Sequence, residues 1–214
     1  MKRLATSALA TAFLLTACGG SKTLTLPDQP IDRAATCGIV AAAQARVAMT
    51  DIKKPLPFEA QGKILHYATI AASDTGTFEP QTANSVSARM PALQAHVTEG
   101  KWQTLLPACA AAYPAAEIKD VTLPASRTDA LLACDELAGF VTIALDGQNS
   151  IYGHQLYEYR QLKNTLDHSL VAGLRARAGS GLAAQQAERR KAMAKASALG
   201  SPVAVLDQCK AKFG

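Results

Sequence analysis

Residues 152–174 read YGHQLYEYRQLKNTLDHSLVAGL, and this stretch decides the fold class because its apolar side chains recur every three or four positions. That spacing places them along one face of an α-helix. The pattern predicts a long amphipathic helix whose apolar side belongs to the core. The core-facing residues are Tyr152, Leu156, Tyr159, Leu162, Leu166, Leu170 and Leu174.

The rest of the chain also favours helix, since 43 of the 214 residues are alanine and runs of β-branched or aromatic residues are scarce. The hydrophobic content of 49% and charged content of 18% are typical of a globular protein. We therefore expect an all-α, alanine-rich bundle of seven to eight helices. The further helix candidates are 34–49, 58–72, a segment from Pro80 through Val97 that either kinks or divides into two short helices at Pro91, 102–112, 128–145, 182–199, and a last helix that Pro202 opens and that carries Cys209.

The N-terminus has the pattern of a secretory signal peptide at 1–17. Lys2 and Arg3 precede an uncharged run over 4–17. At about 1.5 Å per residue this run covers roughly 21 Å, which is short of the roughly 30 Å core of a bilayer. We therefore interpret the segment as a cleaved signal rather than a membrane-spanning helix.

Leu15, Thr16, Ala17 and Cys18, followed by Gly19, resemble the lipobox of bacterial lipoproteins. The resemblance implies cleavage before Cys18 and lipidation of its sulfur, so that Cys18 anchors the protein in a membrane of the cell envelope, facing the periplasm. A glycine rather than an acidic residue after the cysteine favours the outer membrane over the inner. The alternative is an ordinary signal peptide with an incidental cysteine. Residues 18–32, rich in Gly, Ser and Pro, are predicted to form a flexible tether.

Four cysteines remain, namely Cys37, Cys109, Cys134 and Cys209. An even number of cysteines in a chain bound for an oxidising compartment predicts two disulfides. Their spacing lacks the paired CxxC pattern of zinc sites, and no metal or cofactor is expected. Four cysteines allow three pairings, and the sequence alone does not choose among them.

A weak internal symmetry favours one of these pairings. Cys37 and Cys109 are 72 residues apart, while Cys134 and Cys209 are 75 apart, and an aromatic residue follows each second cysteine by four positions. If the chain arose by duplication, the predicted disulfides are Cys37–Cys109 and Cys134–Cys209. The symmetry divides the chain into a helical half at 33–114, a Pro-punctuated connection at 115–127 and a second helical half at 128–214.

We find no sequence motif of nucleophilic, nucleotide-dependent or metal-dependent catalysis, and assign no catalytic residue. His154 and His168 share a polar helix face and are interpreted as solvated, and their separation of about 21 Å excludes a shared site. Asp135 and Glu136 are interpreted as solvated charges near a helix start. Tyr152, Tyr159 and Trp102 are assigned to the core. The other two histidines are His66 and His96.

Charge is uneven, since residues 172–214 hold eight Lys or Arg against two acidic residues. A basic face there could contact an envelope protein, anionic lipid or the cell wall, and the alternative is a solvated helix face; a nucleic-acid partner is not expected at this location. The sequence predicts a lipid-anchored binding, inhibitory or scaffolding module. The rival is a hydrolase of envelope polymers, which requires a cleft joining Glu158, His154 or His66 to a second carboxylate.

Overall fold

The computed structural model describes residues 24–214, so the predicted signal peptide and Cys18 lie outside the described residues. Within that range the chain forms eight α-helices and three short 3-10 turns, without a strand, which confirms the all-α prediction. The helices are α1 (Pro30–Val47), α2 (Phe58–Ala71), α3 (Pro80–Glu99), α4 (Leu106–Ala112), α5 (Arg127–Ala144), α6 (Asn149–Ala178), α7 (Leu182–Ser197) and α8 (Pro202–Phe213). The 3-10 turns are Trp102–Leu105, Pro114–Glu117 and Asp146–Gln148.

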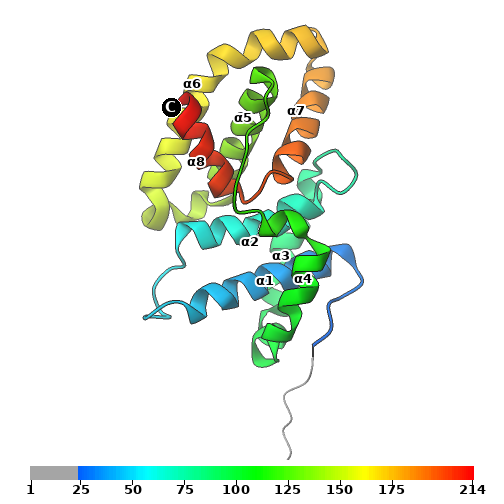
Figure 1. The fold of residues 1–214 in the computed structure, drawn as a ribbon, viewed down its shortest axis with the longest axis vertical. Coiled ribbons are helices and arrows are strands. Elements are labelled where there is room, and N and C mark those ends of the chain that lie inside the picture. The colour runs from blue at the N-terminus through cyan, green and yellow to red at the C-terminus, as the bar shows by residue number, and fades with distance from the viewer. Residues whose placement is uncertain (1–23) are drawn as a thin grey trace, which may run out of the picture.

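The helices form two groups that lie one above the other in Figure 1, with α1–α4 in the lower half and α5–α8 in the upper half. In the lower half α1 contacts α2, α3 and α4; in the upper half α5 contacts α6, α7 and α8. The groups meet where α2 packs against α7 and α8. Buried residues of both groups belong to one continuous core. Each half is therefore built around its first helix, and the halves share a core.

The helix predicted from 152–174 is α6, and all seven residues of its apolar stripe are buried. Its backbone departs from helical geometry at Tyr152, with φ −113° and ψ 20°. The Tyr152 hydroxyl donates a hydrogen bond to the Leu56 carbonyl at 2.6 Å, and its ring packs on Phe58 at 5.3 Å between centroids. Contact with the lower half thus accompanies the kink in α6.

At Pro91, where the sequence left a kink or a division into two short helices open, the structure has one helix. α3 continues from Pro80 to Glu99 through Pro91, so the alternative of two short helices is wrong. Val86 and Val97 are buried on either side of the proline. Packing of these flanking turns against the core offsets the hydrogen bond that the proline cannot donate.

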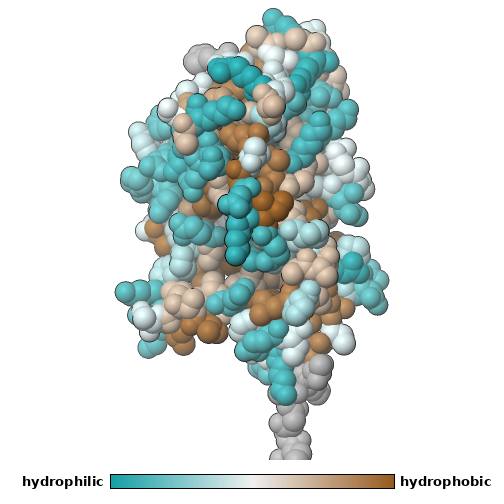
Figure 2. Space-filling view, in the orientation of Figure 1, coloured by the Kyte–Doolittle hydropathy of each residue, from teal (hydrophilic) through white to brown (hydrophobic). Residues whose placement is uncertain are grey.

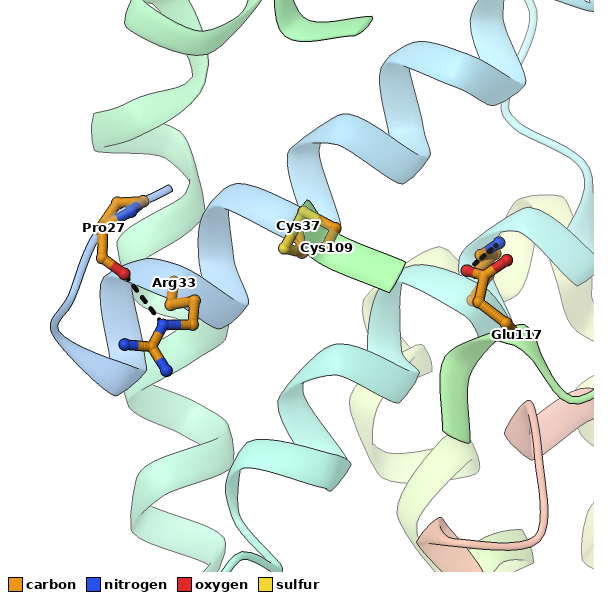
Figure 3. The surroundings of a disulfide bond; sticks show 6 residues. Pro27, Arg33, Cys37, Cys109 and Glu117 are labelled. Carbon is orange, nitrogen blue, oxygen red and sulfur yellow. Dashed lines mark hydrogen bonds and ion pairs between the residues drawn. A yellow bond between two sulfur atoms is a disulfide. The ribbon is translucent and has the colours of Figure 1, made fainter. Parts of the chain in front are cut away.

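The two disulfides join Cys37 to Cys109 and Cys134 to Cys209, the pairing that the internal symmetry favours. The first links α1 to α4 (Figure 3) and the second links α5 to α8. Each bridge therefore ties the first helix of a half to the last helix of the same half.

The predicted flexible tether at 18–32 differs from the structure in its described part. Leu24 is buried, and its side chain lies so close to Gly100 that a Cβ there would meet it at 2.7 Å. The Arg33 guanidinium donates to the Pro27 carbonyl at 3.0 Å (Figure 3) and to the Asp28 carbonyl at 2.6 Å. Because α1 already begins at Pro30, the tether prediction is wrong for residues 24–32, which belong to the folded domain.

Within residues 24–214, none of the helices combines the length and the apolar character that crossing a bilayer requires.

Candidate binding site

A pocket of about 520 Å³ opens between the second half of α5, α6, α7 and the start of α3. That volume lies within the range of about 300–1,000 Å³ typical of small-molecule sites. Helices from both halves of the molecule therefore contribute to it. The pocket is lined by Phe78, Pro80, Asn84, Asp135, Glu136, Gly139, Phe140, Ile143, Ala144, Lys163, Arg189, Arg190 and Met193.

One side of the pocket is apolar. The Phe78 and Phe140 rings pack edge to face, with centroids 5.7 Å apart and planes at 83°. Met193 is buried beside them, while Ile143 on the last turn of α5 is 80% exposed. Ile143 buries little apolar surface when the chain folds, and it borders an apolar pocket. Its side chain can therefore contact a bound partner.

The other side is ionic and is centred on Asp135, which is only 1% exposed. Lys163 of α6 places its Nζ 2.5 Å from Asp135 Oδ1, and Arg189 of α7 places a guanidinium nitrogen 2.5 Å from Asp135 Oδ2. The same Arg189 nitrogen lies 2.6 Å from Glu136 Oε1. Three helices therefore meet at this group of charges, which we call the Asp135 cluster (Asp135, Glu136, Lys163 and Arg189).

The interpretation of Asp135 and Glu136 as solvated charges near a helix start is wrong. They lie in the middle of α5, with Asp135 fully buried and Glu136 partly so. Their cationic partners come from 28 and 54 positions further along the chain, so no local spacing in the sequence reports the contacts. The two carboxylates are functional candidates that sequence reasoning missed.

Burial and ion pairing shift the pKa values of Glu136 and Arg189 in opposite directions. Burial raises the pKa of the Glu136 carboxyl above its usual value, and the hydrogen bond from Arg189 only partly offsets this. For Arg189 burial lowers the pKa, but the hydrogen bonds that it donates to Glu136 and Asp135 outweigh this effect, so that the pKa of Arg189 is raised overall. Arg189 therefore stays charged at any physiological pH.

The geometry suits binding better than acid–base catalysis. Both oxygens of Asp135 are already engaged by cations, which leaves this carboxylate as a group that positions Lys163 and Arg189. Those two side chains keep about a third of their surface exposed and line the pocket. They can therefore contact an anionic group of a ligand while remaining paired to Asp135.

His66 and His154 lie apart from the pocket. His66 is fully buried between α2 and α7, where its Nε2 lies 2.7 Å from the Ser197 carbonyl oxygen. Burial lowers the pKa of His66 to about 4. His154 and Glu158 form an exposed pair on α6 at 3.8 Å, and Glu158 also pairs with Lys210 at 3.0 Å. The cleft that the hydrolase alternative requires is not formed by these residues, which lie outside the lining of the pocket.

The aromatic predictions are confirmed for Tyr152 and Tyr159, which are buried, and Trp102 packs half-buried against the core. His154 is exposed, as predicted, and His96 is exposed as well.

Most cations of the basic C-terminal region are paired with carboxylates. These pairs hold α7 against α5 and the start of α3, and α8 against α6. The excess of basic residues after 172 therefore serves internal contacts in large part. The pairs are Arg177 with Asp129, Arg189 with Asp135 and Glu136, Arg190 with Glu79, Lys191 with Glu188, and Lys210 with Glu158 and Asp207.

The fold and its pocket define a disulfide-linked all-α protein with an amphipathic pocket. No family model, curated protein sequence or solved structure matches the chain.

Proposed function

We propose that this protein is a lipid-anchored binding module of the cell envelope, which takes a small amphipathic anion into the pocket between α5, α6 and α7. The observation that carries the proposal is the Asp135 cluster, a buried carboxylate that directs Lys163 and Arg189 toward an apolar pocket. Lipidated Cys18 would hold the module on the periplasmic face of the outer membrane, as the lipobox resemblance implies.

Folding alone gives little reason to keep charges at this place. Taking ions out of water is costly, and buried ion pairs can often be replaced by apolar residues without loss of stability. The lower half of this protein illustrates such a replacement. Gly38 follows Cys37 as Asp135 follows Cys134, and the space beside Gly38 holds the methyl group of Met90, 2.4 Å from where a Cβ would lie. A functional role for the Asp135 cluster explains its presence better than a structural one.

The lining of the pocket indicates the chemistry of the ligand. Lys163 and Arg189 pair with Asp135 and Glu136, and Arg190 pairs with Glu79, yet Lys163 and Arg189 keep about a third of their side-chain surface exposed. An anionic head group can contact these exposed parts, while an apolar body packs on Phe140 and Ile143. The ligand class is therefore an organic anion with an aromatic or aliphatic body.

The proposal is tested with 4-phenylbutanoate, a soluble carboxylate with an apolar ring. The full mature protein, isotopically labelled at Ile and Met methyl groups, is titrated and followed by NMR. We expect saturable shifts of the Ile143 and Met193 methyl signals with a single affinity. Absence of saturable shifts at both methyl groups would refute the proposal for this ligand class.

Two variants identify the side chains responsible. Lys163→Gln removes the charge in the pocket and is expected to weaken binding about tenfold, while Lys63→Gln removes a similarly exposed ion-paired lysine outside it and leaves the affinity unchanged. Ile143→Ser weakens binding without affecting folding, because Ile143 is solvent-exposed in the free protein. Equal effects of the two lysine variants would contradict the assigned site.

A further inference from the structure

The end of α1 and the segment that follows it present apolar side chains to solvent beside basic ones. Val47 is 75% exposed and Ile52 is 70% exposed, and Lys53 and Lys54 beside Ile52 are also exposed. Figure 2 shows hydrophobic and hydrophilic residues side by side where this segment protrudes at the lower left. We call residues 46–54 the basic-apolar loop. It holds three cations and one carboxylate.

The shape of the basic-apolar loop is fixed by its own hydrogen bonds. The Arg46 guanidinium donates to the Ile52 carbonyl at 3.0 Å and also to the Lys54 carbonyl. The Asp51 carboxylate accepts from the Lys53 amide at 2.9 Å. The exposure of Ile52 therefore belongs to an ordered loop, and little conformational entropy is lost when such a loop meets a partner.

The start of the described chain indicates which partner is near. Leu24 packs against Gly100, and only residues 19–23 lie between it and Cys18. The coloured ribbon starts at the lower end of the molecule in Figure 1. Even fully extended, the stretch from Cys18 to Leu24 spans only about 20 Å. α1 crosses the same lower half, and the basic-apolar loop protrudes from its far end (Figure 1). A bilayer that holds Cys18 is therefore within reach of this loop.

We propose that the basic-apolar loop is a second membrane contact, in which Val47 and Ile52 enter the interface of the bilayer and Lys53 and Lys54 meet anionic phospholipid head groups. Lysines near an anionic surface and exposed apolar side chains both favour interfacial binding. The inference rests on the lipid anchor of the proposed function. Its consequence is that the lower half lies on the membrane, while α6 and α7 extend away from it.

The contact is tested on mature protein purified from membranes and incorporated into nanodiscs of phosphatidylglycerol that contain a nitroxide-labelled lipid. Mass spectrometry first establishes the lipid on Cys18. We expect the nitroxide to broaden the methyl signals of Val47 and Ile52 in NMR spectra. Leu182 is the internal control, because it is 77% exposed but begins α7 at the opposite end of the molecule (Figure 1), and its methyl signals stay sharp.

Charge variants then separate a specific contact from general attraction. Lys53→Gln with Lys54→Gln is expected to shift the contact equilibrium by about tenfold or more, with less broadening at Ile52. Lys119→Gln with Lys212→Gln removes the same charge from other exposed positions and leaves the broadening unchanged.

The outcomes distinguish the loop from the anchor. Sharp Ile52 signals with a lipid on Cys18, or equal broadening at Ile52 and Leu182, overturn the loop contact while the anchor stands. A mature protein without lipid on Cys18 overturns the anchor, and the loop contact with it.

Discussion

The two halves of the molecule, α1–α4 and α5–α8, share a framework but differ at the residue after their first cysteine. Cys37 and Cys134 are each the eighth residue of an 18-residue helix, and each bridges to the last helix of its half. The next residue is Gly38 in α1 but Asp135 in α5. Met90 of α3 packs against the glycine, whereas Arg189 of α7 and Lys163 of α6 pair with the aspartate.

The same arrangement of disulfide-linked helices therefore accommodates either an apolar contact or an ionic one at this position. The half that keeps the ionic contact is also the half in which the contact lines the amphipathic pocket. We therefore interpret α1–α4 as the supporting half and α5–α8 as the half that supplies most of the lining of the proposed binding site. Four predictions, in decreasing order of effect, test this comparison.

Removal of a disulfide should affect the halves equally. The bridges enclose 72 and 75 residues, and in the chain-entropy model each contributes roughly 4 kcal/mol to the free energy of unfolding. Cys37→Ser with Cys109→Ser, and Cys134→Ser with Cys209→Ser, are compared by urea unfolding. A much larger loss for one pair would show that one half depends on its bridge more than the other.

Removal of Asp135 should destabilise the protein by about 3 kcal/mol, because it leaves Arg189 and Lys163 partly buried without their carboxylate. Asp135→Leu alone is compared with a variant that also carries Lys163→Met and Arg189→Met. The combined variant imitates the apolar contact of the lower half and should recover most of the free energy of unfolding. If it is as unstable as Asp135→Leu, the ionic cluster is structural and the comparison fails.

The contact between the halves should weaken in acid. The pKa of His66 is lowered to about 4 in the folded state by burial, against 6.5 when the residue is exposed. The unfolded chain therefore takes up a proton first as pH falls through 6.5, and stability is lost progressively until the folded protein also protonates near pH 4. Between pH 7.5 and 5 this single group removes about 2 kcal/mol.

The measurement is the free energy of unfolding as a function of pH for the native protein, His66→Gln and His96→Gln. The exposed His96 serves as the control, and its replacement should leave the pH dependence intact. An unchanged slope in His66→Gln would assign the acid sensitivity to other groups.

The sequence predicted the elements well because helix periodicity is a local property. The stripe over 152–174 predicted α6, and the cysteine spacing favoured the observed disulfides. The sequence did not predict contacts between distant segments. Asp135 pairs with Lys163 and Arg189 on other helices, and His66 contacts the Ser197 carbonyl of α7. Leu24 was assigned to a tether for the same reason, because Gly100 provides its packing site.

The smallest predicted effect is a change of sign between two glycine substitutions. Alanine is favoured over glycine inside a helix by about 1 kcal/mol. At Gly139 of α5 the new methyl group has room, since its nearest neighbour is Lys163 Cε at 4.0 Å, so Gly139→Ala should stabilise the protein. At Gly38 the methyl group would meet Met90, and displacing that side chain costs about 1–3 kcal/mol, which outweighs the gain.

Thermal unfolding of the two variants measures this sign directly. Combining Gly38→Ala with Met90→Ala should relieve the overlap at the cost of apolar contact, so the pair should be less destabilised than the sum of the single variants. Stabilisation by Gly38→Ala alone would mean that Met90 moves freely. The apolar contact of the lower half would then be loose, whereas the Asp135 cluster fixes its three helices by directed hydrogen bonds.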